Sequence, residues 1–412
     1  MNNVQFRSNI ILFFIITILF FVSISAFDPF ISSYATTLGI SPAVIGTIMG
    51  GTGLASLIFR FPLGVLSDVL NKRKVFIQVG LLITVVGWII AFIEPNATTL
   101  YLGKFLDGIT GSTWVIYTVM FASYFGPKNA AKAVALLTLA DYVGALMGSA
   151  VGGIVAENFS YPHTFLVAVF AASIAFILIF FLKEQKAPVN KEKYDKKIII
   201  EQITDKKLWV ISLLAVIAQM ALFGMRDTFT PLVARDLGAD AIALSWLSNT
   251  YKISAGAAAA LCGVFFYKKM GLVNTAVLGA FLQFVAAILI PFAPSLSLLF
   301  TLQALSGVAF ALNFTVLMSL SIVNVPARKQ STRMGFFQSV YSFGIFFGPV
   351  MMGILTEAFS RNLSFLIIGI LSAISGVLIK LYIKPKPIEK QNPRSEIGHD
   401  NTWEITKNSQ VD

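Results

Sequence analysis

Residues 64–75, GVLSDVLNKRKV, place one acid and three consecutive bases between two long apolar runs. The runs, 43–66 and 75–93, each have the length of a membrane-spanning helix, which needs about 20 mostly apolar residues. Lys and Arg gather in the cytoplasmic loops of membrane proteins. The stretch therefore predicts a short cytoplasmic loop between two helices that cross a bilayer.

Apolar runs of similar length recur along the whole chain. The chain is 56% hydrophobic and 12% charged, whereas about 25% of a typical soluble chain is charged. We therefore predict an all-α integral membrane protein with twelve transmembrane helices. The ten other runs are 10–33, 100–123, 133–155, 164–182, 208–233, 242–266, 273–292, 296–323, 333–358 and 364–383.

A polar segment divides the apolar chain into two near-equal parts. Residues 183–207 separate the first six runs from the last six, which predicts a cytoplasmic linker between two bundles, 1–182 and 208–383. Residues 384–412 are polar and have no apolar periodicity, so we expect a mobile cytoplasmic tail.

The second part of the linker has a pattern of its own. Ile199, Ile200 and Ile203 are spaced for one face of a helix. The pattern favours a short interfacial helix, and a solvated charged loop is the alternative.

The basic residues predict the orientation of the chain. With the N-terminus in the cytoplasm, and apart from linker and tail, the inside loops hold eleven Lys and Arg, against Arg235 and Arg361 outside. This bias predicts a multi-pass protein of the plasma membrane with both termini cytoplasmic. It also accounts for the formal charge of +11 without a nucleic-acid partner.

The two halves of the chain match each other at a nearly fixed offset. Landmark residues recur 199 positions later, and two glycines of the fifth run recur 200 positions later. This agreement predicts two parallel six-helix repeats related by an axis along the membrane normal. The pairs are Asp28 and Asp227, Gly39 and Gly238, Gly64 and Gly263, Gly108 and Gly307, Pro127 and Pro326, Gly144 and Gly344, and Gly148 and Gly348.

Five residues of the loop at 64–75 stand at the places of a known signature. They are Gly64, Leu66, Asp68, Lys72 and Arg73. The loop thereby resembles that of the major facilitator superfamily, although Val69 and Asn71 stand where the signature has Arg and Gly. In that family the element latches one half against the other in the outward-open state. The resemblance implies a latch made by Gly64, Asp68, Lys72 and Arg73, and a purely topogenic loop is the alternative.

Two further segments resemble patterns of transporters in this superfamily. LGKFLDGITG, residues 102–111, is similar to a fourth-span pattern of proton-coupled carriers, with Lys104 in the place of Arg. GALMGSAVGG, residues 144–153, resembles the antiporter signature of drug exporters, with Ser149 in the place of proline. Generic helix packing is the alternative, because glycines at every fourth position let helices approach closely. The expected packing glycines are Gly144, Gly148, Gly152, Gly344 and Gly348.

Charged residues at membrane depth are the candidate functional residues, because each costs at least about 2.5 kcal/mol to insert. Seven residues qualify, whereas Arg60 lies nearer the cytoplasmic interface. When ionised they carry three positive and four negative charges, which leaves one acid without a partner. The seven are Asp28, Lys104, Asp107, Asp141, Arg226, Asp227 and Lys252.

An unpaired acid in a low dielectric favours its protonated form and is a candidate to carry a proton. The candidates for proton coupling are Asp28, Lys104, Asp107 and Asp141, with Asp107 or Asp28 as the carrier and Lys104 as the group whose pairing alternates. The alternative is a set of static ion pairs that only fix helix packing. The candidates for the substrate cavity are Arg226, Asp227, Lys252, Trp114, Tyr117 and Asn249, of which the aromatic and amide side chains have plain packing as the alternative.

The sequence favours transport over catalysis. It has no phosphate-cradling loop, no nucleotide-binding domain and no cluster of His with carboxylates, and its single cysteine, Cys262, cannot form an internal disulfide. We expect no enzyme activity, cofactor or metal. The expected partners are the bilayer, a small-molecule substrate and protons, and the expected state is a monomer.

Secondary transport by alternating access is the leading hypothesis. The span-four and glycine signatures favour proton-coupled efflux of lipophilic, drug-like compounds. The main alternative is proton symport or uniport of a polar nutrient or metabolite, such as an organic acid or a sugar. A membrane sensor built on a transporter fold is a third possibility with less support.

Overall fold

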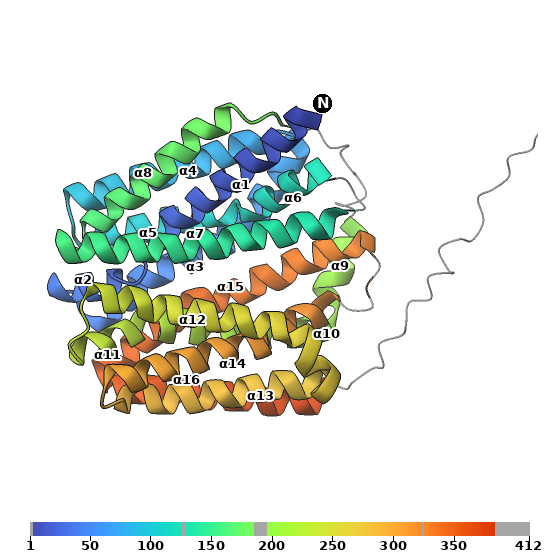
Figure 1. The fold of residues 1–412 in the computed structure, drawn as a ribbon. Helices are drawn as coiled ribbons and strands as arrows, with labels where there is room; N and C mark the ends of the chain where they lie inside the picture. Colours follow the sequence, from blue (N-terminus) through green and yellow to red (C-terminus); the bar gives the residue numbers. More distant parts are fainter. Residues whose placement is uncertain (1–2, 126–128, 185–195, 323–324, 326, 384–412) are drawn as a thin grey trace, which may run out of the picture.

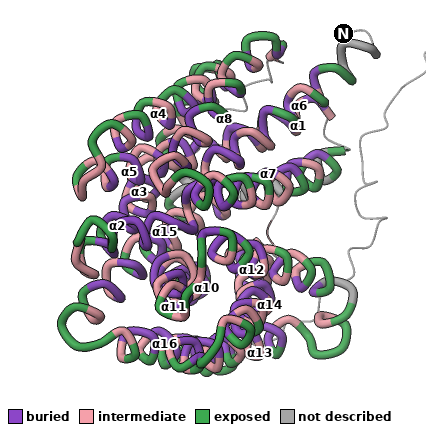
Figure 2. Tube along the Cα trace, turned by 60° about the vertical axis from the view of Figure 1, so that its left-hand side comes forward, coloured by how far each residue is buried: buried purple, intermediate pink, exposed green. Residues whose placement is uncertain are grey.

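The computed structural model describes residues 3–125, 129–184, 196–322, 325 and 327–383 (Figure 1). All regular structure in these ranges is helical. Helices α1 to α8 form one bundle and α10 to α16 form a second bundle beside it, as Figures 1 and 2 show. The predicted all-α fold of two repeats is confirmed.

Eight helices make up the first bundle. They are α1 (Asn3–Ser25), α2 (Ile31–Thr37), α3 (Pro42–Leu70), α4 (Arg73–Ile93), α5 (Ala97–Ser112), α6 (Trp114–Phe125), α7 (Ala130–Asn158) and α8 (His163–Phe180).

The second part of the structure begins with the short helix α9 (Lys196–Thr204), so the described part of the linker contains the helix that its isoleucine spacing favours. The remaining elements are α10 (Lys206–Met220), a π-helical segment (Ala221–Phe229), α11 (Thr230–Asp236), α12 (Ala241–Leu261), a second π-helical segment (Cys262–Phe266), α13 (Tyr267–Leu289), a 3-10 turn (Ile290–Phe292), α14 (Leu296–Ile322), α15 (Ala327–Ala358) and α16 (Arg361–Tyr382).

The described helices form twelve rods, of which ten are long and apolar enough to cross a membrane. The other two are α5 with α6, which break at Thr113, and α12 with the π-helical segment that follows it. Both rods carry charge at mid-depth, Lys104 and Asp107 in α5 and Lys252 in α12. The sequence predicts both runs as single spans, and the structure shows that the first of them is broken into two shorter helices at Thr113.

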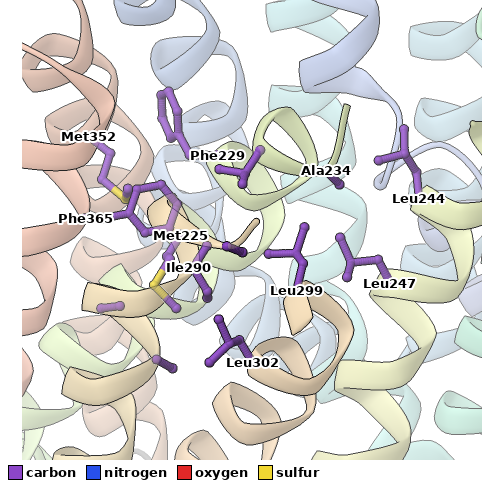
Figure 3. Packing of buried hydrophobic residues seen from close by; sticks show 14 of the residues in the cluster. Met225, Phe229, Ala234, Leu244, Leu247, Ile290, Leu299, Leu302, Met352 and Phe365 are labelled. Carbon is purple, nitrogen blue, oxygen red and sulfur yellow. The ribbon is translucent and has the colours of Figure 1, made fainter. Parts of the chain in front are cut away.

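Apolar side chains cover the outside of the bundles as well as their cores. Figure 2 shows exposed residues along the outer helices, and many are large and apolar, such as Phe170, Phe181 and Leu381. Lipid is the solvent that accommodates such a surface. The core of the second bundle, by contrast, is packed from several helices around Met225, Phe229 and Phe365 (Figure 3).

Equivalent contacts recur in the two bundles. A Cβ atom on Gly108 in α5 would lie 2.4 Å from the carbonyl oxygen of Thr52 in α3. A Cβ atom on Gly307 in α14 would lie 2.5 Å from the carbonyl oxygen of Tyr251 in α12. Both residues of the second contact stand 199 positions after those of the first. The repeat therefore extends to individual helix crossings.

The glycines of the fifth and eleventh rods pack against the first and seventh. A Cβ atom on Gly144 would lie 2.4 Å from the Ile18 oxygen, and one on Gly152 would lie 1.9 Å from the Ala26 oxygen. Gly148 likewise faces Val22 of α1, and Gly344 and Gly348 face the backbone of Val216 and Met220. Only glycine permits backbones this close. These contacts hold each bundle together as a unit.

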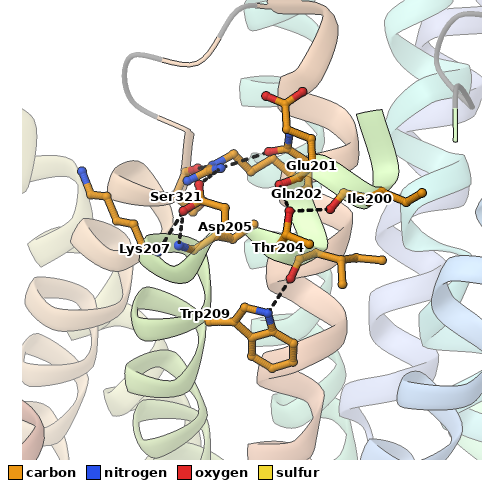
Figure 4. A network of polar contacts seen from close by, with 11 residues as sticks. Ile200, Glu201, Gln202, Thr204, Asp205, Lys207, Trp209 and Ser321 are labelled. Atoms are coloured by element: carbon orange, nitrogen blue, oxygen red, sulfur yellow. Dashed lines mark hydrogen bonds and ion pairs between the residues drawn. The ribbon is translucent and has the colours of Figure 1, made fainter. Parts of the chain in front are cut away.

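A polar network fastens the described end of the linker to the second bundle (Figure 4). The buried Arg333 of α15 donates to the carboxylate of Asp205, to Gln202 Oε1 and to the carbonyl oxygen of Ser321. Asp205 also caps α10 by accepting from the backbone N–H of Lys207 at 2.8 Å. Burial raises the pKa of Asp205, but the hydrogen bond and charge of Arg333 outweigh this and hold the pKa below its usual value of 3.8.

We expect Gly152→Ala to destabilise the protein by about 1–3 kcal/mol, because its methyl group would overlap a backbone oxygen that cannot turn away. Gly335→Ala in α15 is the matched control, since nothing lies within 4 Å of a Cβ atom there. The thermal unfolding midpoint in lipid nanodiscs should fall for Gly152→Ala alone. Equal midpoints for the two variants would contradict close packing of α7 on α1.

We expect Asp205→Asn to lower the free energy of unfolding by about 1 kcal/mol at neutral pH, because it removes a hydrogen bond between charged groups. Asp240→Asn is the control, since Asp240 caps α12 in the same way, accepting from Ala243. Because the folded pKa of Asp205 is lowered, its contribution is present above the unfolded value and is lost as the pH falls through the folded value. The difference in the free energy of unfolding between Asp205→Asn and wild type, measured as a function of pH, should therefore vanish in acid. A difference that grows in acid would be evidence against the network.

Candidate functional site

A central cavity of about 440 Å³ lies between the two bundles. Its wall includes all seven residues predicted from charge at membrane depth: Asp28, Lys104, Asp107, Asp141, Arg226, Asp227 and Lys252. Trp114 also lines it, together with Arg60, which the sequence places nearer the interface. Residues that are 224 positions apart thus share one site.

The first charged cluster belongs to the first bundle. Lys104 Nζ lies 2.8 Å from Asp28 Oδ1 and 4.0 Å from Asp107 Oδ2. The side chain of Asp107 is 2% exposed, and its Oδ1 has no hydrogen-bond partner among the described residues. One lysine therefore serves two carboxylates, of which Asp28 holds it more closely.

The acids Asp28 and Asp227 stand where regular α-helix is interrupted. Asp28 lies between α1 and α2, directly before Pro29, and a residue before proline disfavours the α conformation. Asp227 lies in the π-helical segment Ala221–Phe229, shortly before Pro231. Interrupted helices leave backbone groups facing a cavity and are common at functional sites. The repeat thus supplies two equivalent irregular positions, each with an acid.

The second charged cluster belongs to the second bundle. Arg226 pairs with its neighbour Asp227, and its guanidinium carbon lies 4.7 Å from the ring centroid of Tyr251. Its Nε has no hydrogen-bond partner in the part of the chain that the structure describes. This arginine therefore lines the cavity with one buried donor that has no partner in the described residues.

The structure brings Lys252 and Asp141 to the cavity without pairing them. Lys252 Nζ donates to the carbonyl oxygen of Ala145 in α7 at 3.2 Å. Within the described ranges, no carboxylate oxygen lies within 4.0 Å of this lysine.

Two residues expected in the cavity lie elsewhere. Tyr117 is fully buried in the core of the first bundle, where its ring lies 4.6 Å from that of Phe20. Asn249 lies in the interface between α7 and α12 and donates to the carbonyl oxygen of Leu146. For both, the packing alternative describes the contacts observed. Of the other aromatic residues that the sequence offers for the path, Tyr142, next to Asp141, and Tyr251 line the cavity.

Close packing seals one end of the cavity, which we call the α2–α11 end after the two helices there. Along α3 and α15, a Cβ atom on Gly46 would lie 2.2 Å from the Pro349 oxygen, and one on Gly53 would lie 2.3 Å from the Phe346 nitrogen. Ser245 of α12 donates to the carbonyl oxygen of Ser149 in α7 at 2.7 Å. No solute can pass between backbones this close.

Two carboxylates cap helices across the same seal. Glu157 Oε2, at the end of α7, accepts from the backbone N–H of Ala241 at 3.0 Å, and Glu357 Oε2, at the end of α15, accepts from that of Ala43 at 2.9 Å. A carboxylate at a helix N-terminus is favourable because it meets unpaired N–H groups and the positive end of the dipole. The two contacts are repeat-related, since the acids lie 200 positions apart.

Within the described part of the chain, the close contacts between the bundles end before the opposite end is reached. Along α7 and α12 they extend from Glu157 to the approach of the Tyr142 ring to Gly256. Along α3 and α15, Arg60 donates to Tyr341 Oη at 3.1 Å, and among the described residues no hydrogen bond joins these helices beyond it. The cavity is thus closed at the α2–α11 end, and among the residues that the structure describes no such seal is found toward the end that holds α9, which we call the unsealed end.

The structure describes only part of the predicted latch, and the contacts described for Gly64 and for the Arg73 backbone lie on the side of the first bundle. The nearest neighbour of a Cβ atom on Gly64 would be a Val115 methyl group at 3.9 Å, within the same bundle. The backbone N–H of Arg73 donates to Glu184, and Lys72 precedes α4 and is exposed. The side chain of Asp68 lies outside the described part of the structure. The close helix approach expected at Gly64 is therefore not seen here.

A two-repeat helical fold around a charged cavity that is sealed at one end defines a membrane transporter. The sequence profile of the Major Facilitator Superfamily matches residues 13–232 and 211–409. The chain therefore belongs to this superfamily of secondary transporters, as its loop and glycine signatures predict.

Several relatives resemble the chain at low identity. An uncharacterised transporter of Methanocaldococcus jannaschii is 23% identical over 410 residues, covering 92% of this chain and 99% of its own. YuxJ, an uncharacterised transporter of Bacillus subtilis, is 24% identical over 85% of this chain and 93% of its own. The multi-drug resistance efflux pump PmrA of Streptococcus pneumoniae is 27% identical over 198 residues, which is 47% of this chain and 49% of PmrA.

Solved structures share the fold. A bacterial homologue of the human lysosomal transporter Spinster, in an inward-facing conformation, superposes with a TM-score of 0.76 at 15% identity, covering 92% of this chain and 97% of its own. The nucleoside transporter NupG superposes with a TM-score of 0.73 at 17% identity, covering 94% of this chain and 100% of its own.

We expect the double variant Glu157→Gln with Glu357→Gln to open the α2–α11 end more often, because neutral amides lose the charge that favours both helix N-termini. The reporter is Gly111→Cys in a Cys262→Ala background, since Gly111 lines the cavity and a Cβ atom there meets nothing within 4 Å. A membrane-impermeant maleimide added at the α2–α11 side should label the double variant several times faster. Glu94→Gln, an exposed acid outside the seal, is the control. Unchanged labelling of the double variant would show that glycine packing alone makes the seal.

Proposed function

We propose that this protein is a proton-coupled secondary transporter that exports lipophilic, drug-like compounds by alternating access. The observation that carries the proposal is the lysine at the centre of the first charged cluster, with Asp28 at 2.8 Å and Asp107 at 4.0 Å. A lysine shared by two acids can pair fully with only one of them. The other acid can then take up a proton, which burial of a charge without full compensation favours.

Asp107 is the proposed proton carrier. Its side chain is more buried than that of Asp28, at 2% against 25% exposed, and one of its oxygens accepts no hydrogen bond from the described residues. Asp28 instead holds Lys104 closely. A proton on Asp107 would release Lys104 fully to Asp28, and loss of that proton would draw the lysine back. Asp28 and Lys104 thus take part by pairing.

The side chains that line the cavity favour a substrate with an apolar, aromatic body. Aromatic side chains from both bundles line it between the charged clusters: Phe20, Phe21, Trp114, Tyr142, Phe223, Tyr251 and Phe310. The likeness of one half of the chain to PmrA, a multi-drug efflux pump, favours the same substrate class. Binding pockets of this kind combine apolar walls with a few polar groups that orient the ligand.

The proposal includes an orientation and a division into parts. The protein lies in the plasma membrane with both termini in the cytoplasm. The unsealed end of the cavity then faces the cytoplasm. Residues 1–182 and 208–383 move as two bundles about the linker 183–207, with a tail at 384–412, and the monomer is the working unit. The loop residues Gly64, Asp68, Lys72 and Arg73 would form their latch in the opposite, outward-open state.

Import or uniport of a polar metabolite is the second candidate. Arg226 Nε has no hydrogen-bond partner among the described residues, and none of their carboxylate oxygens lies within 4.0 Å of Lys252 Nζ, which favours a substrate with an acidic or otherwise polar group. In that case the cations of the second bundle would bind substrate.

The test is proton flux in proteoliposomes followed with a pH-sensitive dye. Lipophilic cations form one series, and sugars and organic acids form the other. We expect lipophilic cations to drive flux in the wild type, and we expect Asp107→Asn to reduce it to the level of empty liposomes, because the amide cannot carry the proton. Glu94→Gln, an exposed acid outside the cavity, should keep the wild-type rate.

The other outcomes decide between the candidates. Flux that only polar metabolites drive would favour symport. Flux that persists in both Asp107→Asn and Asp28→Asn would remove these acids from the coupling mechanism. Silence in both series would favour a uniporter or a substrate outside the two series.

A further inference from the structure

Asp141 and Lys252 face the same cavity from opposite bundles without meeting. Asp141 lies on α7 and Lys252 on α12, the two helices that pack together across the interface. Lys252 donates to a backbone oxygen, and Asp141 has no ion pair or side-chain hydrogen bond among the described residues. An unpaired charge at membrane depth is unfavourable, so two such groups of opposite sign are poised to pair.

The other charged groups near Lys252 already have partners. Asp227 pairs with Arg226, and Asp28 and Asp107 lie within 4.0 Å of Lys104. Among the four acids of the cavity wall, Asp141 is therefore the one left without a cation.

The register of α7 and α12 explains why the pair is not formed in this conformation. The helices run antiparallel from Glu157 and Ala241 at the α2–α11 end to Tyr142 and Gly256. Lys252 now bonds to Ala145, which lies one helical turn, about 6 Å, nearer the sealed end than Asp141. Asp141 is next to Tyr142, whose contact with Gly256 is the last close approach of the two helices among the described residues.

We propose that Lys252 leaves the Ala145 oxygen and pairs with Asp141 when the cavity opens at the α2–α11 end, so that this ion pair stabilises the opposite conformation. Rocking of the bundles separates α7 from α12 at the sealed end and brings them together at the unsealed end. The first movement withdraws Ala145 from Lys252, and the second brings Asp141 toward it. Lys252 thus exchanges one partner for another as the bundles move. The inference rests on the alternating access proposed above, but it does not depend on the substrate or on the proton carrier.

The test measures how often the α2–α11 end opens, without substrate or proton gradient. The reporter is Gly111→Cys in a Cys262→Ala background, and an impermeant maleimide is added at the α2–α11 side of sealed vesicles. We expect Asp141→Asn and Lys252→Gln each to slow labelling by about tenfold, the effect of losing a close charge pair at an interface. Lys252→Arg, which keeps the charge, should retain most of the wild-type rate.

A variant in which the two charged residues are exchanged distinguishes loss of the ion pair from loss of folding. The double variant Asp141→Lys with Lys252→Asp should label faster than either single variant, because the pair is restored with its polarity reversed. Lys132→Gln, an exposed lysine on α7, should have no effect. Labelling within twofold of wild type in both single variants would overturn the proposal, as would slow labelling that the exchange does not restore. The labelling assay needs no transport. Asp107→Asn can therefore keep its proton flux, against the proposed function, while the labelling results still support the ion pair, and the labelling results can contradict the ion pair while the flux results support the proposed function.

Discussion

The charged groups of the cavity are held in a medium that favours neutral or paired side chains, and most of the site follows from this constraint. Asp28 is paired with Lys104 and Asp227 with Arg226, which leaves Asp107 partly compensated and leaves Asp141 and Lys252 apart. Incomplete pairing is unfavourable in one fixed structure. It becomes useful in a protein with two conformations, because a group that lacks a partner in one can find it in the other.

The scaffold permits such an exchange because each bundle is rigid within itself. Glycines let α7 lie against α1, and α15 against the seventh rod, at distances that admit no side chain. Packed surfaces of this kind move as units and are not continuously deformable. The same close packing seals the cavity where α3 meets α15. A movement between the bundles must therefore separate whole helix faces, together with the carboxylates of Glu157 and Glu357 that cap helices across them.

Patterns that depend on lipid or on repetition could be predicted from the sequence. The spans, the repeat and the seven charges of the cavity all follow from where apolar and charged residues occur, and the structure places those charges around one cavity. Partners could not be predicted, because they depend on helix rotation: Tyr117 turns into a bundle core and Arg60 toward Tyr341. The helix breaks at Asp28 and Thr113 were also missed, since apolar periodicity runs through them. The repeat offset of 200 residues alone would have identified Glu157 and Glu357 as equivalent positions of the two halves.

The packing of the helices follows the repeat, but most of the charged residues of the cavity do not. At the equivalent offset, the glycine contacts and the acids Asp28 and Asp227 recur, but Lys104 corresponds to Gln303, Asp107 to Ser306 and Asp141 to Tyr341. Lys252 likewise corresponds to Gly53, which packs in the seal. A symmetric scaffold gives two conformations of similar construction, because each helix crossing has its counterpart. Charges that break the symmetry make these conformations unequal in their ion pairs. A proton or a substrate can then favour one over the other, since a ligand shifts an equilibrium only by its difference in affinity for the two states.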